Sequence, residues 1–130
     1  MPETNDKLRI EVKRAYDAPA KSDGHRTLVD RIWPRGVSRD ELRLDDWVKE
    51  IAPSTELRKW FDHDPAKCSA FKDRYFRELD EKPGLIEALL ANVRAGTLTL
   101  VFGAKDTECN NATALKEYLE RHFEKKARAG

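Results

Sequence analysis

The residues best suited to chemistry gather at the end of an apolar segment, residues 27–33. They are Asp30, Arg31, Trp33, Arg35 and Gly36. A guanidinium group stays charged under all working conditions and holds a carboxylate or phosphate through two parallel hydrogen bonds. We therefore predict that Arg31 and Arg35 clamp an anionic ligand, and that Asp30 orients these two arginines.

A second set of polar residues follows another apolar segment, residues 97–102. It consists of Lys105, Asp106, Asn110 and Asn111. In a catalytic site, Lys105 would stabilise developing negative charge, and Asp106 would act as the acid or base. Asn110 and Asn111 precede a predicted helix, where anions bind favourably, so their amide groups would position the substrate.

The residues of the first set also have structural interpretations. Asp30 could form an ion pair with Arg31 or Arg26, because buried charges are usually paired. Trp33 could stack on the ring of a ligand, but a tryptophan in this position more often belongs to the core. The functional and the structural interpretation therefore both stay open for these side chains.

Similar alternatives hold for the second set and for two histidines. Asp106 or Asn110 could simply cap the helix that follows. His25 and His63 could each serve as a general base or as a hydrogen-bonded structural residue, and His63 could pair with Asp64.

Four segments have the patterns of strands, and these strands decide where the polar residues lie. Residues 8–13 alternate between apolar and charged side chains, as expected of an edge strand. Residues 27–33 predict a central strand, 97–102 another strand, and 47–51 a weaker one. In an open α/β sheet, ligands bind at the carboxyl ends of strands, so the two polar sets are expected to meet at one site.

Helical patterns fill most of the remaining sequence. The predicted helices cover residues 39–43, 54–61, 64–80, 85–93 and 112–123. Ser38 and Glu41 match a capping box, Ser54 and Asp64 are further capping residues, and Gly96 is expected to cap the end of the fourth helix.

Strands that alternate with helices favour a small α/β domain. We predict one domain over residues 1–130, because this length suits a single core. It would have three layers, with a mostly parallel sheet of about four strands flanked by helices. Residues 1–6 and 126–130 are expected to be loose termini.

The composition excludes several classes of protein. Charged residues make up 38% of the chain, and no apolar stretch approaches the ~20 residues that a membrane span needs. Residues 1–7 lack the features of a secretory signal, so we expect a cytoplasmic protein. Because the net charge is only +1, nucleic acid is a possible partner but not a favoured one. The expected partner is a small anionic ligand.

The cysteines and the known sequence motifs suggest neither a metal site nor a cofactor. Cys68 and Cys109 lie far apart, so no disulfide framework or zinc site is expected, and Cys68 is interpreted as a small core residue. Walker, Gly-x-Gly-x-x-Gly and Gly-x-Ser-x-Gly motifs are absent from the sequence.

Several blocks of sequence resemble the YeaO-like branch of a bacterial family, domain of unknown function 488. The resemblance extends from about Ile10 to about Leu119, and the most specific block is Trp33-Pro34-Arg35-Gly36. It also includes residues 52–61, 63–65, 104–106 and 110–112. The resemblance implies a cytoplasmic α/β protein whose characteristic polar residues lie in the same two loops, and it implies no established reaction.

The leading hypothesis is a small enzyme that acts on a phosphate- or carboxylate-bearing substrate, which could resemble a nucleotide. The alternative is a module that binds an anionic metabolite or a nucleic-acid end without catalysis. In a third interpretation, the two loops only stabilise the fold or a subunit interface.

Overall fold

The protein is built around one sheet of four parallel strands. The structure is a computed structural model that describes the backbone of residues 8–91 and 96–129, and the side chains of these residues up to His122. The strands are β1 (Leu8–Arg14), β2 (His25–Leu28), β3 (Asp46–Trp47) and β4 (Gly96–Phe102). Their order is β1-β4-β2-β3, and all neighbours are parallel. The predicted small α/β fold is therefore confirmed, and the predicted edge strand is β1.

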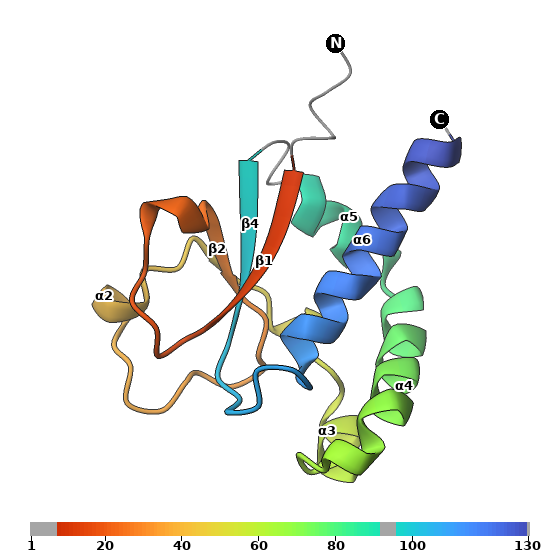
Figure 1. Cartoon of the computed structure of the whole chain (residues 1–130), viewed down its shortest axis with the longest axis horizontal. Coiled ribbons are helices and arrows are strands. Elements are labelled where there is room, and N and C mark those ends of the chain that lie inside the picture. The colour runs from red at the N-terminus through yellow and green to blue at the C-terminus, as the bar shows by residue number, and fades with distance from the viewer. Residues whose placement is uncertain (1–7, 92–95, 130) are drawn as a thin grey trace.

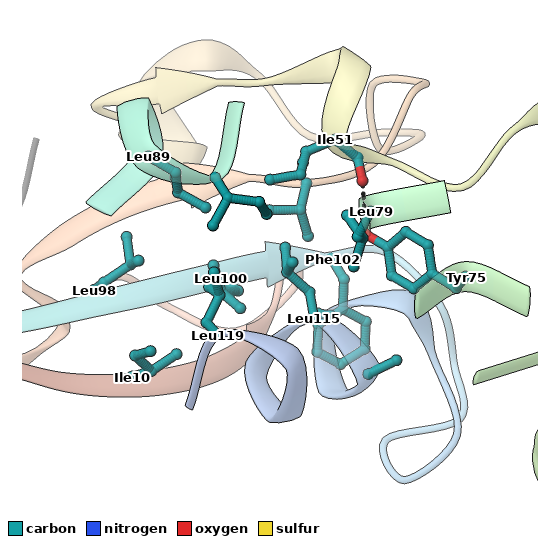
Figure 2. Close-up of a cluster of buried hydrophobic side chains, with 14 of the residues drawn as sticks. Ile10, Ile51, Tyr75, Leu79, Leu89, Leu98, Leu100, Phe102, Leu115 and Leu119 are labelled. Carbon is teal, nitrogen blue, oxygen red and sulfur yellow. Dashed lines mark hydrogen bonds between the residues drawn. The ribbon is translucent and has the colours of Figure 1, made fainter. Parts of the chain in front are cut away.

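Helices pack on one face of this sheet. They are α3 (Thr55–Phe61), α4 (Cys68–Asp80), α5 (Pro83–Ala91) and α6 (Asn111–Ala129). In Figure 1, α6 lies beside the sheet and α4 lies on its outer side. Alternate residues of β4, from Leu98 to Phe102, point into this layer and lie among leucines of α6 (Figure 2). This apolar cluster is the main core of the protein.

The opposite face carries a smaller cluster. Val101 of β4 and Leu28 of β2 pack there against Leu42, the last residue of the short helix α2 (Arg39–Leu42). Trp33 and Trp47 pack against this cluster, and their rings lie edge to face with each other, with centroids 5.3 Å apart. The long connection between β2 and β3 is thereby fixed on the sheet.

A buried arginine of β2 forms an ion pair with the turn before this strand and hydrogen bonds with α2. Nη1 of Arg26 donates to Oδ2 of Asp23 at 2.6 Å, and its Nε and Nη2 donate to the carbonyl oxygen of Leu42 at 3.1 and 2.8 Å. Lys13 of β1 also binds Asp23, at 3.1 Å. Arg26 thus belongs to the framework of the fold, and its partner is Asp23, not Asp30.

The second strand is shorter than predicted, because it ends at Leu28 and not at residue 33. The N–H of Val29 still donates to the carbonyl of Val101 at 3.0 Å. The next hydrogen bond to β4 is made by a side chain, since Oδ2 of Asp30 accepts from the N–H of Gly103 at 2.8 Å. The chain can therefore leave the sheet at the point where the polar residues begin.

The predicted strand over residues 47–51 is wrong for a related reason. Only Asp46 and Trp47 pair with β2, and residues 49–51 form a 3-10 turn. Because β2 ends at Leu28, whose carbonyl accepts from the N–H of Val48, β3 has no further backbone to pair with.

Most predicted helices form close to their expected bounds. Ser38 and Glu41 make the predicted capping box, and α2 ends one residue early, at Leu42. Residues 65–67 form a 3-10 turn before α4, which ends at Asp80 as predicted. Gly96 is the first residue of β4. The expected end of the fourth helix at residues 92–93 and the loose terminus at residues 1–6 lie outside the described residues.

Ser54 fixes the start of α3. Its Oγ accepts from the N–H of Leu57 at 3.1 Å and donates to Oε2 of Glu78 on α4 at 2.6 Å. We expect Ser54→Ala to lower the free energy of unfolding by about 1–2 kcal/mol, measured by urea denaturation, because both bonds are lost. The exposed Ser69→Ala is the control, with a change within about 0.5 kcal/mol. Equal urea midpoints for the two variants would contradict this role.

Candidate functional site

A cleft of about 650 Å³ opens at the carboxyl ends of β2 and β4. Its walls come from loop 29–38, loop 103–110 and the region around α3. The two sets of polar residues therefore meet, as the strand pattern predicted. Of the predicted site residues, the following line the cleft: Asp30, Arg31, Trp33, Arg35, Lys105, Asp106, Asn110 and Asn111. Gly36 is not among the lining residues; it is exposed, with a φ of 80°.

Asp30 ties the two loops together. Its Oδ2 accepts from the N–H of Gly103 at 2.8 Å, and its Oδ1 accepts from Nδ2 of Asn111 at 3.0 Å. Burial raises the pKa of Asp30, and these hydrogen bonds and the charge of Arg58 offset only part of that effect. The alternative interpretation, an ion pair of Asp30 with Arg31 or Arg26, is not formed within the described part of the chain.

Asn111, Asn110 and Asp106 all make hydrogen bonds that shape loop 103–110. Nδ2 of Asn111 donates to the carbonyl of Val29 at 3.0 Å as well as to Asp30. Asn110 is buried, its Oδ1 accepts from the N–H of Thr113 at 2.8 Å, and it thereby caps α6. Its Nδ2 donates to the carbonyl of Asp106 at 2.8 Å. These amide groups hold the wall of the cleft.

Asp106 is exposed, but one of its oxygens is engaged by the backbone. Oδ1 accepts from the N–H groups of Cys109 and Glu108, each at 2.9 Å. These two bonds lower the pKa of Asp106, and the charge of His63 adds to the effect. A carboxylate that is held in its charged form is a poor proton donor near neutral pH.

Four cations line the cleft: Arg31, Arg35, Arg58 and Lys105. None of them forms an ion pair with a described carboxylate, although Arg58 is close enough to act on Asp30. The lining carboxylates are Asp30 and Asp106, so four cationic side chains face two anionic ones. The cleft therefore carries an excess of positive charge.

Among these four cations, Arg31 is the one with a buried donor that lacks a partner within the described residues. Its Nε is buried and has no hydrogen-bond partner among the described residues. Its Nη2 reaches the carbonyl of Ala52 only at 3.4 Å, which is a long and weak bond. Trp33 packs against the smaller core cluster, its Nε1 donates to the carbonyl of Val37 at 2.6 Å, and the residue also lines the cleft. Its stacking on a ligand stays a prediction.

Sequence reasoning missed the contribution of α3 and of the turn that follows it. Arg58, Phe61 and His63 line the cleft from this region, and Phe71 lines it from α4. Asp64 caps the turn through the N–H of Ala66. The alternative pair of Asp64 with His63 is not found among the described residues. His25 lies elsewhere, with its Nε2 at 3.9 Å from Oδ2 of Asp46. No sequence motif could have identified Arg58, because only the packing of α3 brings it to the cleft.

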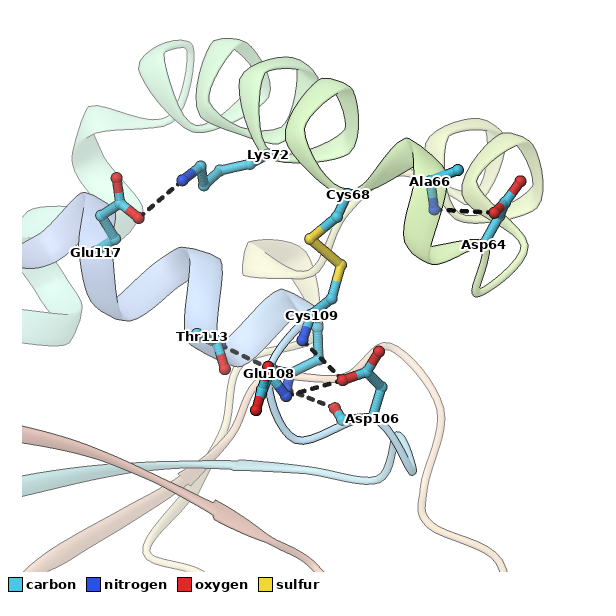
Figure 3. Close-up of a disulfide and its surroundings, with 10 residues drawn as sticks. Asp64, Ala66, Cys68, Lys72, Asp106, Glu108, Cys109, Thr113 and Glu117 are labelled. Atoms are coloured by element: carbon cyan, nitrogen blue, oxygen red, sulfur yellow. Dashed lines mark hydrogen bonds and ion pairs between the residues drawn. A yellow bond between two sulfur atoms is a disulfide. The ribbon is translucent and has the colours of Figure 1, made fainter.

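The prediction for the cysteines is wrong. Cys68, at the start of α4, forms a disulfide with Cys109 of loop 103–110, and neither residue is fully buried (Figure 3). Their separation of 41 residues hid this pairing in the sequence. The parallel sheet returns the chain after β4 to the beginning of α4, which brings the two sulfur atoms together. Cys109 also lines the cleft.

Across the described residues, no group of three or more His, Cys, Asp or Glu is placed to hold a metal ion. The helices of the described part are also too short or too polar to cross a membrane. What the cleft offers is guanidinium and ammonium groups beside apolar and aromatic side chains.

Comparison with known proteins places the chain in a family. The family model DUF488-N3i, described as the inactive DUF488-N3 subclade, matches residues 9–130. The uncharacterized protein YeaO of Escherichia coli K12 is 42% identical over 112 residues, which cover 86% of this chain and 97% of YeaO. The uncharacterized protein Rv3073c of Mycobacterium tuberculosis H37Rv is 37% identical over 111 residues, or 85% of this chain and 93% of the relative. No solved structure gives a significant match. The chain therefore belongs to the DUF488-N3i family, within the larger family that its sequence resembles.

Proposed function

We propose that the cleft binds a small organic anion, and that the protein acts as a binding module. The observation that carries this proposal is the buried Nε of Arg31, which has no hydrogen-bond partner among the described residues although Arg31 lines the cleft. Leaving a buried donor without a partner costs about 1–3 kcal/mol. A carboxylate or phosphate that enters the cleft would bind the weakly bound Nη2, and a small rotation of the guanidinium group would bring Nε to the same anion.

The surrounding charges support an anionic ligand. Arg35, Arg58 and Lys105 lie on different walls of the cleft and have no carboxylate partner in the described parts of the chain. Asp30 is already engaged by Gly103 and Asn111, so it competes little with a ligand for the arginines. An incoming anion would meet a net positive field, because the four lining cations outnumber the two lining carboxylates.

The other walls favour a ligand that also has an apolar part. Phe61, Phe71, Pro53 and Ala104 line the cleft beside the cations. Ile32, which is 58% exposed, lines it from loop 29–38. Apolar walls with a few placed polar groups are typical of sites for small organic molecules. The expected ligand is therefore a carboxylate or phosphate ester with a hydrophobic or aromatic group.

Binding without catalysis is favoured over the enzymatic hypothesis. The residue predicted to act as acid or base, Asp106, has one oxygen bound by two N–H groups and a lowered pKa. Both oxygens of Asp30 are engaged in holding the loops. The description of the matched family as an inactive subclade supports the same conclusion.

Arg31→Gln tests the proposal, with phenyl phosphate as the probe and with inorganic phosphate and benzyl alcohol as partial mimics. We expect phenyl phosphate to bind the wild-type protein, and to bind Arg31→Gln about 10- to 100-fold more weakly, since a hydrogen bond to a charged group contributes about 1.5–3 kcal/mol. Affinity is measured by calorimetry, and melting temperatures without ligand show that the variant is folded. Both partial mimics should bind more weakly than phenyl phosphate.

Arg77→Gln is the matched control, because Arg77 is an exposed residue of α4 that does not line the cleft. It should bind phenyl phosphate as the wild type does. Equal affinities of Arg31→Gln and wild type would place the anion elsewhere. Absence of binding by the wild-type protein, at concentrations up to the millimolar range, would contradict the proposed function.

A further inference from the structure

We infer that Cys109 is a site of thiol–disulfide exchange with a small anionic thiol that enters the cleft. Cys109 lines the cleft, whereas its partner Cys68 does not. The same cleft holds four cations that have no carboxylate partner among the residues described. A disulfide in the wall of a positively charged cleft is placed to react with a thiol that carries a negative charge. This inference rests on the proposed anion-binding function.

The reaction is balanced by the thiol itself, which is the reductant. Its thiolate attacks Sγ of Cys109 and forms a mixed disulfide, while the bond between the two protein sulfur atoms breaks. The electron pair of that bond leaves with Sγ of Cys68, which then takes a proton from water. A second thiolate can attack the mixed disulfide and release the external disulfide, and this leaves two cysteine thiols in the protein.

The position of Cys68 favours attack on Cys109 over attack on Cys68. Cys68 is the first residue of α4, a helix of 13 residues, and the positive end of a helix stabilises a thiolate. A stabilised thiolate is the better leaving group in exchange. Cys109 faces the cleft, and its N–H is held by Asp106 at 2.9 Å, so its sulfur atom is presented from a fixed segment of backbone.

The charges in the cleft should select among thiols. Lys105 lies four residues before Cys109 in the same loop, and Arg58 lines the cleft from α3. Side chains of one sign around a cleft raise the local concentration of an oppositely charged reagent and its association rate by 10- to 1,000-fold at low ionic strength. The effect falls at high salt because exposed charges are screened.

Three thiols of similar size test this inference. They are 2-mercaptoethanesulfonate (anionic), 2-mercaptoethanol (neutral) and cysteamine (cationic). Rates of loss of the Cys68–Cys109 disulfide are followed by alkylation and mass spectrometry, and each is divided by the fraction of the thiol present as thiolate. We expect the sulfonate to react about tenfold faster than the neutral thiol at low salt, and cysteamine to react slowest. The differences should shrink in 0.5 M salt.

Variants locate the effect. Arg58→Gln and Lys105→Gln should each reduce the advantage of the sulfonate, and Arg77→Gln should preserve it. Peptide mapping should find the mixed disulfide on Cys109. In Cys68→Ser, which has no disulfide, the free Cys109 should react faster with the disulfide of 2-mercaptoethanesulfonate than with cystamine. This last comparison does not depend on which sulfur atom leaves.

The outcomes separate the two proposals. Equal corrected rates for the three thiols, with phenyl phosphate still bound by the wild-type protein, would overturn this inference and leave the proposed function standing. A mixed disulfide found on Cys68 would also overturn it. Equal rates together with no binding of phenyl phosphate would overturn both.

Discussion

Arg26→Met is expected to lower the free energy of unfolding by about 3 kcal/mol, measured by urea denaturation at pH 7. Arg26 is only 3% exposed, and its guanidinium group binds the Asp23 carboxylate and the carbonyl of Leu42. Methionine fills similar space but leaves a buried carboxylate with one cation fewer. Removal of one partner of a buried pair costs about 3–5 kcal/mol, and we expect the lower end because Lys13 still binds Asp23.

The pH dependence gives an internal check on this assignment. Burial alone would raise the pKa of Asp23, but the N–H of Ala20 and the side chains of Lys13 and Arg26 outweigh it and lower the pKa. Because the pKa of Asp23 is lower in the folded protein than in the unfolded chain, its ionised carboxylate stabilises the fold at pH values above about 3.9, the pKa in the unfolded chain. This stabilisation is lost as the pH falls through the pKa in the folded protein. The difference in the free energy of unfolding between wild type and Arg26→Met should therefore become smaller below about pH 4.

Arg39→Met is the control for this comparison, because Arg39 is an exposed residue of α2, and the partners of Arg26 are Asp23 and Leu42. Its stability should change by less than about 0.5 kcal/mol. An equally small change in Arg26→Met, or a difference from wild type that does not vary with pH, would contradict the structural role of the pair.

Asn111→Asp is expected to lower the free energy of unfolding by about 3–4 kcal/mol at pH 7. Nδ2 of Asn111 donates to the carbonyl of Val29 and to Oδ1 of Asp30, both at 3.0 Å. Aspartate cannot donate these bonds when it is ionised, and it would place a second carboxylate against Asp30. Asn111→Ala, the control, loses the bonds without adding a charge and should cost only about 2 kcal/mol.

At lower pH, the free energies of unfolding of Asn111→Asp and Asn111→Ala should become more similar. Two facing carboxylates raise the pKa of one of them, because both cannot remain ionised at so short a distance. A carboxyl group whose pKa is raised by folding favours the folded protein at low pH, and this contribution is lost as the pH rises through its pKa in the folded protein. Urea denaturation at pH 7 and pH 5 should therefore show a smaller gap between Asn111→Asp and Asn111→Ala at pH 5. A gap that does not change with pH would show that the two carboxylates do not interact.

The meeting of the two polar loops could be predicted from the sequence because it depends only on strand direction. Residues that follow β2 and β4 must lie at the same edge if the strands are parallel, and Asp30 and Asn111 accordingly form a direct hydrogen bond. The ends of the strands were harder to predict. Asp30 replaces a backbone acceptor of the sheet with its side chain, and hydrophobic patterns carry no information on such a substitution.

The helical wall of the cleft could not be predicted, since it depends on packing over long distances in the sequence. Arg58 belongs to a short helix whose start was correctly predicted at Ser54, but the direction in which α3 packs decides that Arg58 faces the cleft. The disulfide has the same origin. Cys68 and Cys109 meet only after α4 and loop 103–110 have been placed by the complete sheet.

The position of β4 in the sheet has a consequence for how the chain folds as it is synthesised. β4 lies between β1 and β2, and Leu8 pairs with Gly96. The first strand thus has no neighbour until residues 96–102 have also left the ribosome. Contacts between such distant segments carry a large loop-closure cost and slow the search for the native topology. Until then, β1 and β2 expose unpaired edges, and the nascent protein is most prone to aggregate in this interval.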